Sequence, residues 1–140
     1  MVDPRVGLAC LDANPIISLL LGEPADHAQA VHELLEAVAV RGERLWIFPT
    51  TVAEVAVTLD RAYKVAREDI AEELLGFLDH RGLHMERPDI VRAVLGRFVS
   101  HNVPFYDALL AVEMARTGCT EVHTWDHHFD RISGIQRRVP

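Results

Sequence analysis

Short apolar runs alternate with longer amphipathic segments along the chain, and this alternation constrains the fold more than any other feature of the sequence. Four short segments have the length of strands, 6–11, 44–48, 83–86 and 120–124, and the first of them, an apolar run, is expected to be a buried strand. The segments between them place apolar residues at helical spacing, as Val52, Val55 and Leu59 do within 51–63. Strands alternating with helices predict an α/β protein, a three-layer α/β/α sandwich with a mostly parallel central sheet.

Six helices are expected, and 140 residues suffice for one domain, so we predict a single domain over 1–140. The expected helices are 15–22, 26–42, 51–63, 67–80, 88–98 and 106–116. Asn14 is the expected N-cap of the first helix, with Pro15 at the first helical position. Residues 135–139 are expected to add a short edge strand. Ligands of such folds bind beyond the carboxyl ends of the strands.

Composition excludes several classes of protein. Hydrophobic residues make up 49% and charged residues 25%, as in ordinary globular proteins. No apolar run approaches the roughly 20 residues of a membrane span. Residues 1–5 (MVDPR) start no apolar signal segment, so we expect a cytoplasmic protein. Cys10 and Cys119 lie in apolar surroundings and are expected to be buried thiols. The net charge of −7 argues against general nucleic-acid binding.

Four carboxylates occupy positions where an α/β fold places its site. Asp12 follows the first strand, and Asp126 lies two residues after the fourth. Glu54 and Asp107 lie in the first turns of two predicted helices. Because helices that follow strands begin at the carboxyl edge of the sheet, we expect all four to converge there.

Each acid also has an ordinary structural explanation. Thr51 and Glu54 fit a capping box, and Asp107 complements a helix dipole. Asp126 fits the cap of the turn that follows it, and Asp12 fits a turn before Asn14. Four converging carboxylates would nevertheless repel one another unless a cation neutralised them. Oxygen ligands favour Mg²⁺ or Mn²⁺, which activate water and stabilise phosphodiester oxygens during hydrolysis.

The four acidic segments, taken in order, resemble the PIN-domain family. They are Asp12-Ala13-Asn14, then 50–55 (TTVAEV), 106–111 (YDALLA) and 124–129 (TWDHHF). The closest type is the VapC-like toxin of prokaryotic toxin–antitoxin pairs, and the similarity extends over nearly the whole chain. The resemblance implies a metal-dependent endoribonuclease with Mg²⁺ or Mn²⁺ as its cofactor.

The resemblance also assigns site residues. The matching catalytic acids are Asp12, Glu54, Asp107 and Asp126. Of these, Asp12, Asp107 and Asp126 match metal ligands. Asn14 and Thr124 match polar residues that orient ligands or water beside the metal. Asp130 is a spare acid that would replace or assist Asp126, while His127 and His128 receive no role.

The resemblance further implies partners: an RNA substrate, a second copy in a homodimer, and a cognate antitoxin that covers the acidic cleft with a basic side chain. Leu19, Leu20 and Leu21 form an apolar run, part of which we expect to face the antitoxin or the other protomer. Two alternatives stay open within the same fold. One is a binding module without catalysis, and the other is a housekeeping PIN nuclease without an antitoxin.

Other sites are less well supported by the sequence. His123 and His127 are four residues apart, a zinc-binding spacing on a helix, but His123 falls on a predicted strand. The chain contains neither the glycine-rich dinucleotide motif nor a P-loop. Its cysteines form no CxxC pair, which argues against redox chemistry.

Overall fold

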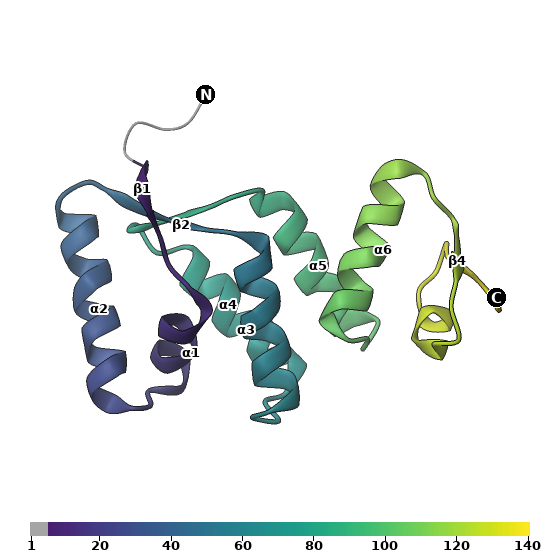
Figure 1. Ribbon diagram of the computed structural model, residues 1–140, viewed down its shortest axis with the longest axis horizontal. Coiled ribbons are helices and arrows are strands. Elements are labelled where there is room, and N and C mark those ends of the chain that lie inside the picture. The colour runs from purple at the N-terminus through teal and green to yellow at the C-terminus, as the bar shows by residue number, and fades with distance from the viewer. Residues whose placement is uncertain (1–5) are drawn as a thin grey trace.

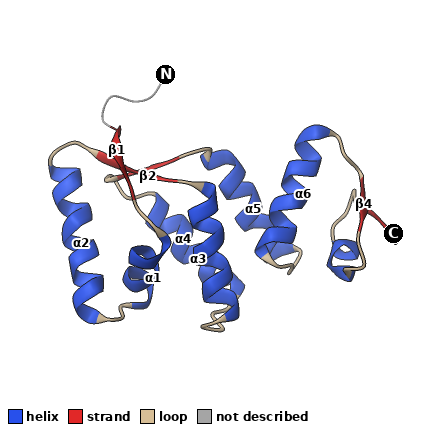
Figure 2. Cartoon of the chain, viewed as in Figure 1, coloured by secondary structure: helices blue, strands red, loops and turns tan. Residues whose placement is uncertain are grey.

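The computed structural model describes residues 6–140 and consists of helices interspersed with short strands (Figures 1 and 2). The strands are β1 (Val6–Cys10), β2 (Arg44–Ile47), β3 (Leu83–Met85), β4 (Glu121–His123) and β5 (Gln136–Arg138). The helices are α1 (Ala13–Leu21), α2 (Ala25–Val40), α3 (Pro49–Arg61), α4 (Arg67–Leu78), α5 (Pro88–Ser100), α6 (Phe105–Thr117) and the short 3-10 helix η1 (His127–Arg131). The expected strands and helices are all present, with ends that differ by a few residues.

All strand pairs in the described part of the chain are parallel, as the α/β prediction requires. β1, β2 and β3 form one sheet in that order, with Leu45 opposite Leu83 and Ile47 opposite Met85. β4 and β5 form a second sheet. The fold class is therefore the predicted one, but the strands form two parallel sheets instead of one continuous sheet.

Two predicted helix starts are wrong, because both helices begin two residues earlier than expected. α1 begins directly after β1, with Asp12 as its N-cap, so Asn14 lies inside the helix. Pro15 still falls in the first turn, where the backbone N–H that proline lacks would have had no helical partner. α3 begins at Pro49, which places Thr51 within the helix, and no capping box forms.

The core lies between the helices and the three-stranded sheet. Phe98 of α5 is fully buried, and its ring packs edge-on against Phe105 at a centroid distance of 5.8 Å. The guanidinium of Arg67 lies 5.2 Å from the centre of the Phe98 ring. Ile47 of β2 and Leu74 of α4 are also fully buried. These contacts join α4, α5 and α6 to the sheet.

Three burial predictions are wrong. In β1 only Val6 is buried, and Leu8 is fully exposed. The reason is that β1 pairs only with β2 within the described residues, so its other edge faces solvent. Cys10 and Cys119 are exposed rather than buried, one at the end of this edge strand and the other just before β4.

The last part of the chain is separate from the first sheet. β4, η1 and β5 pack chiefly against one another and lie at one end of the molecule, beyond α6 (Figure 1). We call residues 121–138 the C-terminal unit, and residues 6–117 the body. Phe129 and Ile132 of the unit are buried in the common core and anchor it to the body.

Residues 1–5, on which the expected absence of a signal sequence rests, lie outside the described residues. Within residues 6–140, none of the helices combines the length and the apolar character that crossing a membrane would require.

Candidate metal centre

Asp107, Asp126 and His128 bring two carboxylates and an imidazole together where the body meets the C-terminal unit. His128 Nδ1 lies 3.0 Å from Asp107 Oδ2 and 2.8 Å from Asp126 Oδ1. One ligand atom from each residue lies within 4.8 Å of the other two. We call these three residues the junction cluster. It is the only group of three such side chains with metal-binding geometry in residues 6–140.

Local structure holds Asp126 in place. Asp126 is the N-cap of η1, and its Oδ1 accepts a hydrogen bond of 2.9 Å from the backbone N–H of His128. The backbone N–H of Asp126 donates to Thr124 Oγ1 at 3.0 Å. The expected turn cap at Asp126 is therefore present. The capped carboxylate also lies beside Asp107, so the structural role of Asp126 is compatible with its proposed site role.

The electrostatics of the cluster favour an ionised Asp126. The backbone N–H of His128 holds the pKa of Asp126 below its usual range, and the His128 side chain acts in the same direction. Asp107 lies in the first turn of α6 and keeps 20% of its side-chain surface exposed, against 42% for Asp126. The cluster is thus partly shielded yet open to solvent.

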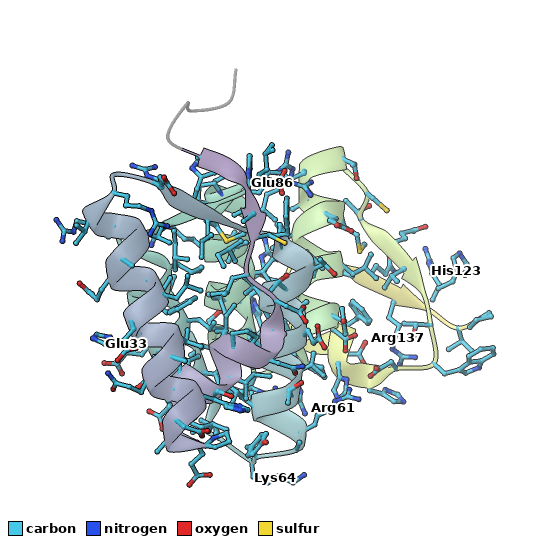
Figure 3. All side chains as sticks on the ribbon, turned by 60° about the vertical axis from the view of Figure 1, so that its left-hand side comes forward. Glu33, Arg61, Lys64, Glu86, His123 and Arg137 are labelled. Atoms are coloured by element: carbon cyan, nitrogen blue, oxygen red, sulfur yellow. The ribbon has the colours of Figure 1, made fainter. Side chains whose placement is uncertain are left out.

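Asp130 belongs to a different set of contacts. Its Oδ1 accepts a hydrogen bond of 3.0 Å from Arg137 of β5, and its Oδ2 lies 3.2 Å from His127 Nδ1. Arg137 and then His127 hold the pKa of Asp130 below its usual range. Figure 3 shows Arg137 beside η1. Asp130 is therefore paired with Arg137 and lies outside the junction cluster.

The expected convergence of four acids is seen for Asp107 and Asp126 only. Asp12, the N-cap of α1, and Glu54, in the second turn of α3, are exposed and lie outside the junction cluster. The cause is topological, because β1 and β4 belong to different sheets and their carboxyl ends share no edge. α3 does contact both α1 and α6, so the helices that carry these acids are neighbours.

The two predicted supporting residues are placed differently. Thr124 contacts the backbone of Asp126, which is the neighbouring position expected of it. Asn14 instead lines a cavity of 390 Å³ together with Glu23, His27 and Tyr63.

His128 was missed by the sequence analysis, which gave it no role. The available signal was its position two residues after Asp126, a spacing that lets a capping turn bring its ring back to the carboxylate. His123 lies on β4, at the outer edge of the molecule (Figure 3), and neither His123 nor His127 belongs to a group of three possible metal ligands in residues 6–140.

A cavity of 530 Å³ lies between the starts of α3 and α5 and one face of α6, and Thr50, Arg87, Tyr106, Glu113 and Arg116 are among the residues that line it. None of the junction cluster residues lines this cavity, although Tyr106 is next to Asp107 in sequence. The cavity is therefore separate from the candidate metal centre.

Comparison with known proteins identifies the family. The family model described as PIN domain matches residues 9–135, which include every acid discussed above. The chain belongs to the PIN-domain family. A relative named VapC ribonuclease, from Aquifex aeolicus (strain VF5), is 24% identical over 122 residues, a match that covers 87% of this chain and 90% of that protein. The predicted resemblance to PIN-domain proteins of the VapC type is confirmed by both findings.

The part of the chain that matches the PIN-domain family includes all three residues of the junction cluster. The family match begins within β1 and ends at residue 135, just before β5, so it spans both the body and the C-terminal unit. The cluster lies between these two parts, with Asp107 from one and Asp126 and His128 from the other. The donor set of two carboxylates and one imidazole is suited to a divalent cation.

Proposed function

We propose that this PIN-domain protein is a metal-dependent endoribonuclease of the toxin type, which hydrolyses RNA phosphodiester bonds. The observation that carries the proposal is that a chain similar to a VapC ribonuclease over 87% of its length places Asp107 and Asp126 side by side. Two ionised carboxylates with atoms within 4.8 Å repel each other unless a cation lies near them. That requirement favours a resident Mg²⁺ or Mn²⁺.

Each candidate site residue has a proposed role in the hydrolysis. Asp107 and Asp126 hold the divalent ion, which when bound supplies charge neutralisation at the scissile phosphate and activates water for in-line attack. Thr124 keeps the Asp126 loop in its position through the 3.0 Å hydrogen bond. Asp12 is proposed as a further ligand, and Glu54 as a carboxylate that accepts a proton from the attacking water.

Contacts between helices support the roles of Asp12 and Glu54. α3 packs against both α1 and α6, so the helix that carries Glu54 is a neighbour of the helices that carry Asp12 and Asp107. Both Asp12 and Glu54 are exposed, so substrate and solvent can reach them. Asn14 is proposed to support the Asp12 side of the site, and Asp130 to assist Asp126.

The proposed partners follow from charge. The chain has a net charge of −7, and the junction cluster exposes carboxylates to solvent. A cognate antitoxin that inserts a basic side chain at these carboxylates would displace the metal and stop cleavage. The functional form is proposed to be a cytoplasmic homodimer, with part of Leu19–Leu21 at a partner surface. These leucines are half-buried, and two of them line a groove beside Glu72 and Phe77.

The test is RNA cleavage by the purified chain with Mn²⁺ or Mg²⁺, against a panel of structured RNAs, read on denaturing gels. Asp107→Asn keeps the side-chain shape and removes a charge, so we expect loss of cleavage with an unchanged circular dichroism spectrum. Asp89→Asn is the matched control, because Asp89 lies in the first turn of α5 as Asp107 does in α6. We expect full activity from Asp89→Asn.

The same assay separates the alternatives. Equal cleavage by Asp107→Asn and the parent would refute the site assignment. If no RNA in the panel is cut while Mn²⁺ binds, a binding module without catalysis becomes the better explanation. Cleavage without any gene for an antitoxin nearby would instead favour a housekeeping nuclease. Asp12→Asn and Glu54→Gln test the two remaining acids, and we expect both variants to lose cleavage.

A further inference from the structure

The two adjacent histidines of η1 make different contacts. His127 Nδ1 lies 3.2 Å from Asp130 and 3.1 Å from Arg137, away from the junction cluster. His128 Nδ1 lies within 3.0 Å of both Asp107 Oδ2 and Asp126 Oδ1. Only His128 therefore directs a ring nitrogen at the two carboxylates.

The distances around His128 suit a shared metal ion. Two ligands at right angles on an ion with bonds of about 2.1 Å lie about 3.0 Å apart. The Nδ1 atom is 2.8 Å from one carboxylate oxygen and 3.0 Å from the other. Both distances from Nδ1 therefore match the spacing of neighbouring ligands on one octahedral ion, and the two carboxylate oxygens lie within 4.8 Å of each other. His128 is also held there, because its own backbone N–H donates to Asp126 Oδ1 at 2.9 Å.

We propose that His128 is a nitrogen ligand of the metal centre and makes the site prefer Mn²⁺ to Mg²⁺. The proposal rests on the metal-dependent function above and adds the identity of the ion. Mg²⁺ binds almost only oxygen and requires near-ideal geometry, whereas the divalent ions of the first transition row, including Mn²⁺, accept an imidazole nitrogen more readily than Mg²⁺ does. Neutral imidazole binds metal through a ring nitrogen that carries no hydrogen, so Nδ1 is the ligand and Nε2 carries the proton.

The same contacts of His128 also fit a second explanation, an ion pair between a protonated ring and the two carboxylates. If His128 served only as a cation between two carboxylates, a divalent ion would have to displace it. Removing the ring would then strengthen metal binding. If His128 is a ligand, removing the ring weakens Mn²⁺ binding. The two explanations predict changes of opposite sign.

The experiment is calorimetric titration of Mn²⁺ and of Mg²⁺ into the apo-protein without RNA, for the parent, His128→Ala and His127→Ala. We expect His128→Ala to weaken Mn²⁺ binding at least about tenfold, the scale seen when even a supporting partner of a ligand is lost. His127→Ala, the matched control, should bind like the parent. Unchanged or tighter Mn²⁺ binding by His128→Ala would overturn the proposal, and so would a parent that does not bind Mn²⁺.

Two further readouts do not depend on activity. Pulsed electron paramagnetic resonance of the Mn²⁺-loaded parent should show coupling to a directly bound ¹⁴N, and His128→Ala should lose it. His128→Asp places an oxygen two bonds from Cβ, where Nδ1 stood, so we expect its ratio of Mn²⁺ to Mg²⁺ affinity to fall. A nitrogen signal that persists in His128→Ala would refute the assignment. A parent that shows the signal but cuts no RNA would refute the proposed function and leave this inference intact.

Discussion

The body and the C-terminal unit are held together by different interactions. In the body, helices pack around the three-stranded sheet, and fully buried side chains such as Phe98, Ile47 and Leu74 supply the core. In the unit, β4, η1 and β5 contribute Phe129 and Ile132 to that core. The unit also contains exposed ion pairs, between Arg138 and Glu121 and between Arg137 and Asp130.

This difference has a consequence for the site. Apolar burial stabilises a structure at any ordinary pH, whereas exposed ion pairs contribute little and depend on salt and pH. The unit also carries Asp126 and His128, while Asp107 belongs to the body. A cation bound at the junction cluster would therefore join the less stable region to the more stable one. The following experiments test that contrast, beginning with the largest expected effect.

Phe98→Ala tests the body. Phe98 is fully buried and packs against Phe105, so we expect the free energy of unfolding to fall by about 3–5 kcal/mol. Urea denaturation followed by circular dichroism measures the loss. Because the core is shared, both regions should unfold together in this variant. A loss below about 1 kcal/mol would mean that the contact between α5 and α6 matters much less than its burial indicates.

Phe129→Ala tests the anchor of the C-terminal unit. Phe129 is buried with 4% of its surface exposed, and we expect the unit to lose about 3 kcal/mol of local stability. Hydrogen exchange should show faster exchange of residues 121–138, while protection of α3, α4 and α5 stays at the parent level. Phe129→Leu, which keeps most of the apolar volume, should retain much of the protection. Equal loss of protection in both regions would show that they form one cooperative unit.

Mn²⁺ tests whether the junction cluster joins the two regions. At 100 times its dissociation constant, an ion that binds only the assembled cluster stabilises it by about 2.7 kcal/mol. We expect Mn²⁺ to slow hydrogen exchange in residues 121–138 and chelation to reverse the effect. Asp107→Asn should abolish it, and Asp89→Asn should not. Protection that does not change with Mn²⁺ in the parent would contradict a bridging ion.

Acid pH is expected to give the smallest effect, a loss of hydrogen-exchange protection in the C-terminal unit. Glu121, Asp126 and Asp130 have a pKa held below the usual range, by Arg138, by the backbone N–H of His128 and by Arg137 respectively. A carboxyl with a lowered folded-state pKa stabilises the fold above its unfolded pKa of about 4, and that stabilisation is lost as pH falls through the folded value. We expect protection factors in 121–138 to fall below pH 4 before those of the body. A simultaneous fall in both regions would contradict the contrast.

Much of the fold was predictable because it depends on local patterns. The apolar runs and helical spacings located the strands and helices of the body, and Pro88 marked the start of α5 as predicted. Local patterns did not show which edge strand would lack a neighbour. Leu8 and Cys10 were expected to be buried, yet they lie on the exposed edge of β1.

The residues of the candidate site were also predictable only in part. Asp107 and Asp126 could be selected because each follows a recognisable helix start or strand end. For His128 the only signal is its spacing from Asp126, and that signal does not decide the matter, since a histidine near an acid in sequence points toward it or away from it according to the turn between them. In η1 the capping bond from the His128 backbone to Asp126 makes that choice, and His127 turns toward Asp130 and Arg137 instead.

The amino-acid sequence by itself determined the α/β class, the order of the elements, the family resemblance and the choice of candidate acids, because these depend on the periodicity, spacing and type of side chains. Only the tertiary structure decided which of those acids meet. Asp107 and Asp126 come together because the C-terminal unit docks on the body through Phe129 and Ile132, which are buried in the common core. Burial of those two side chains, which no local pattern encodes, positions the carboxylates and the imidazole of the junction cluster.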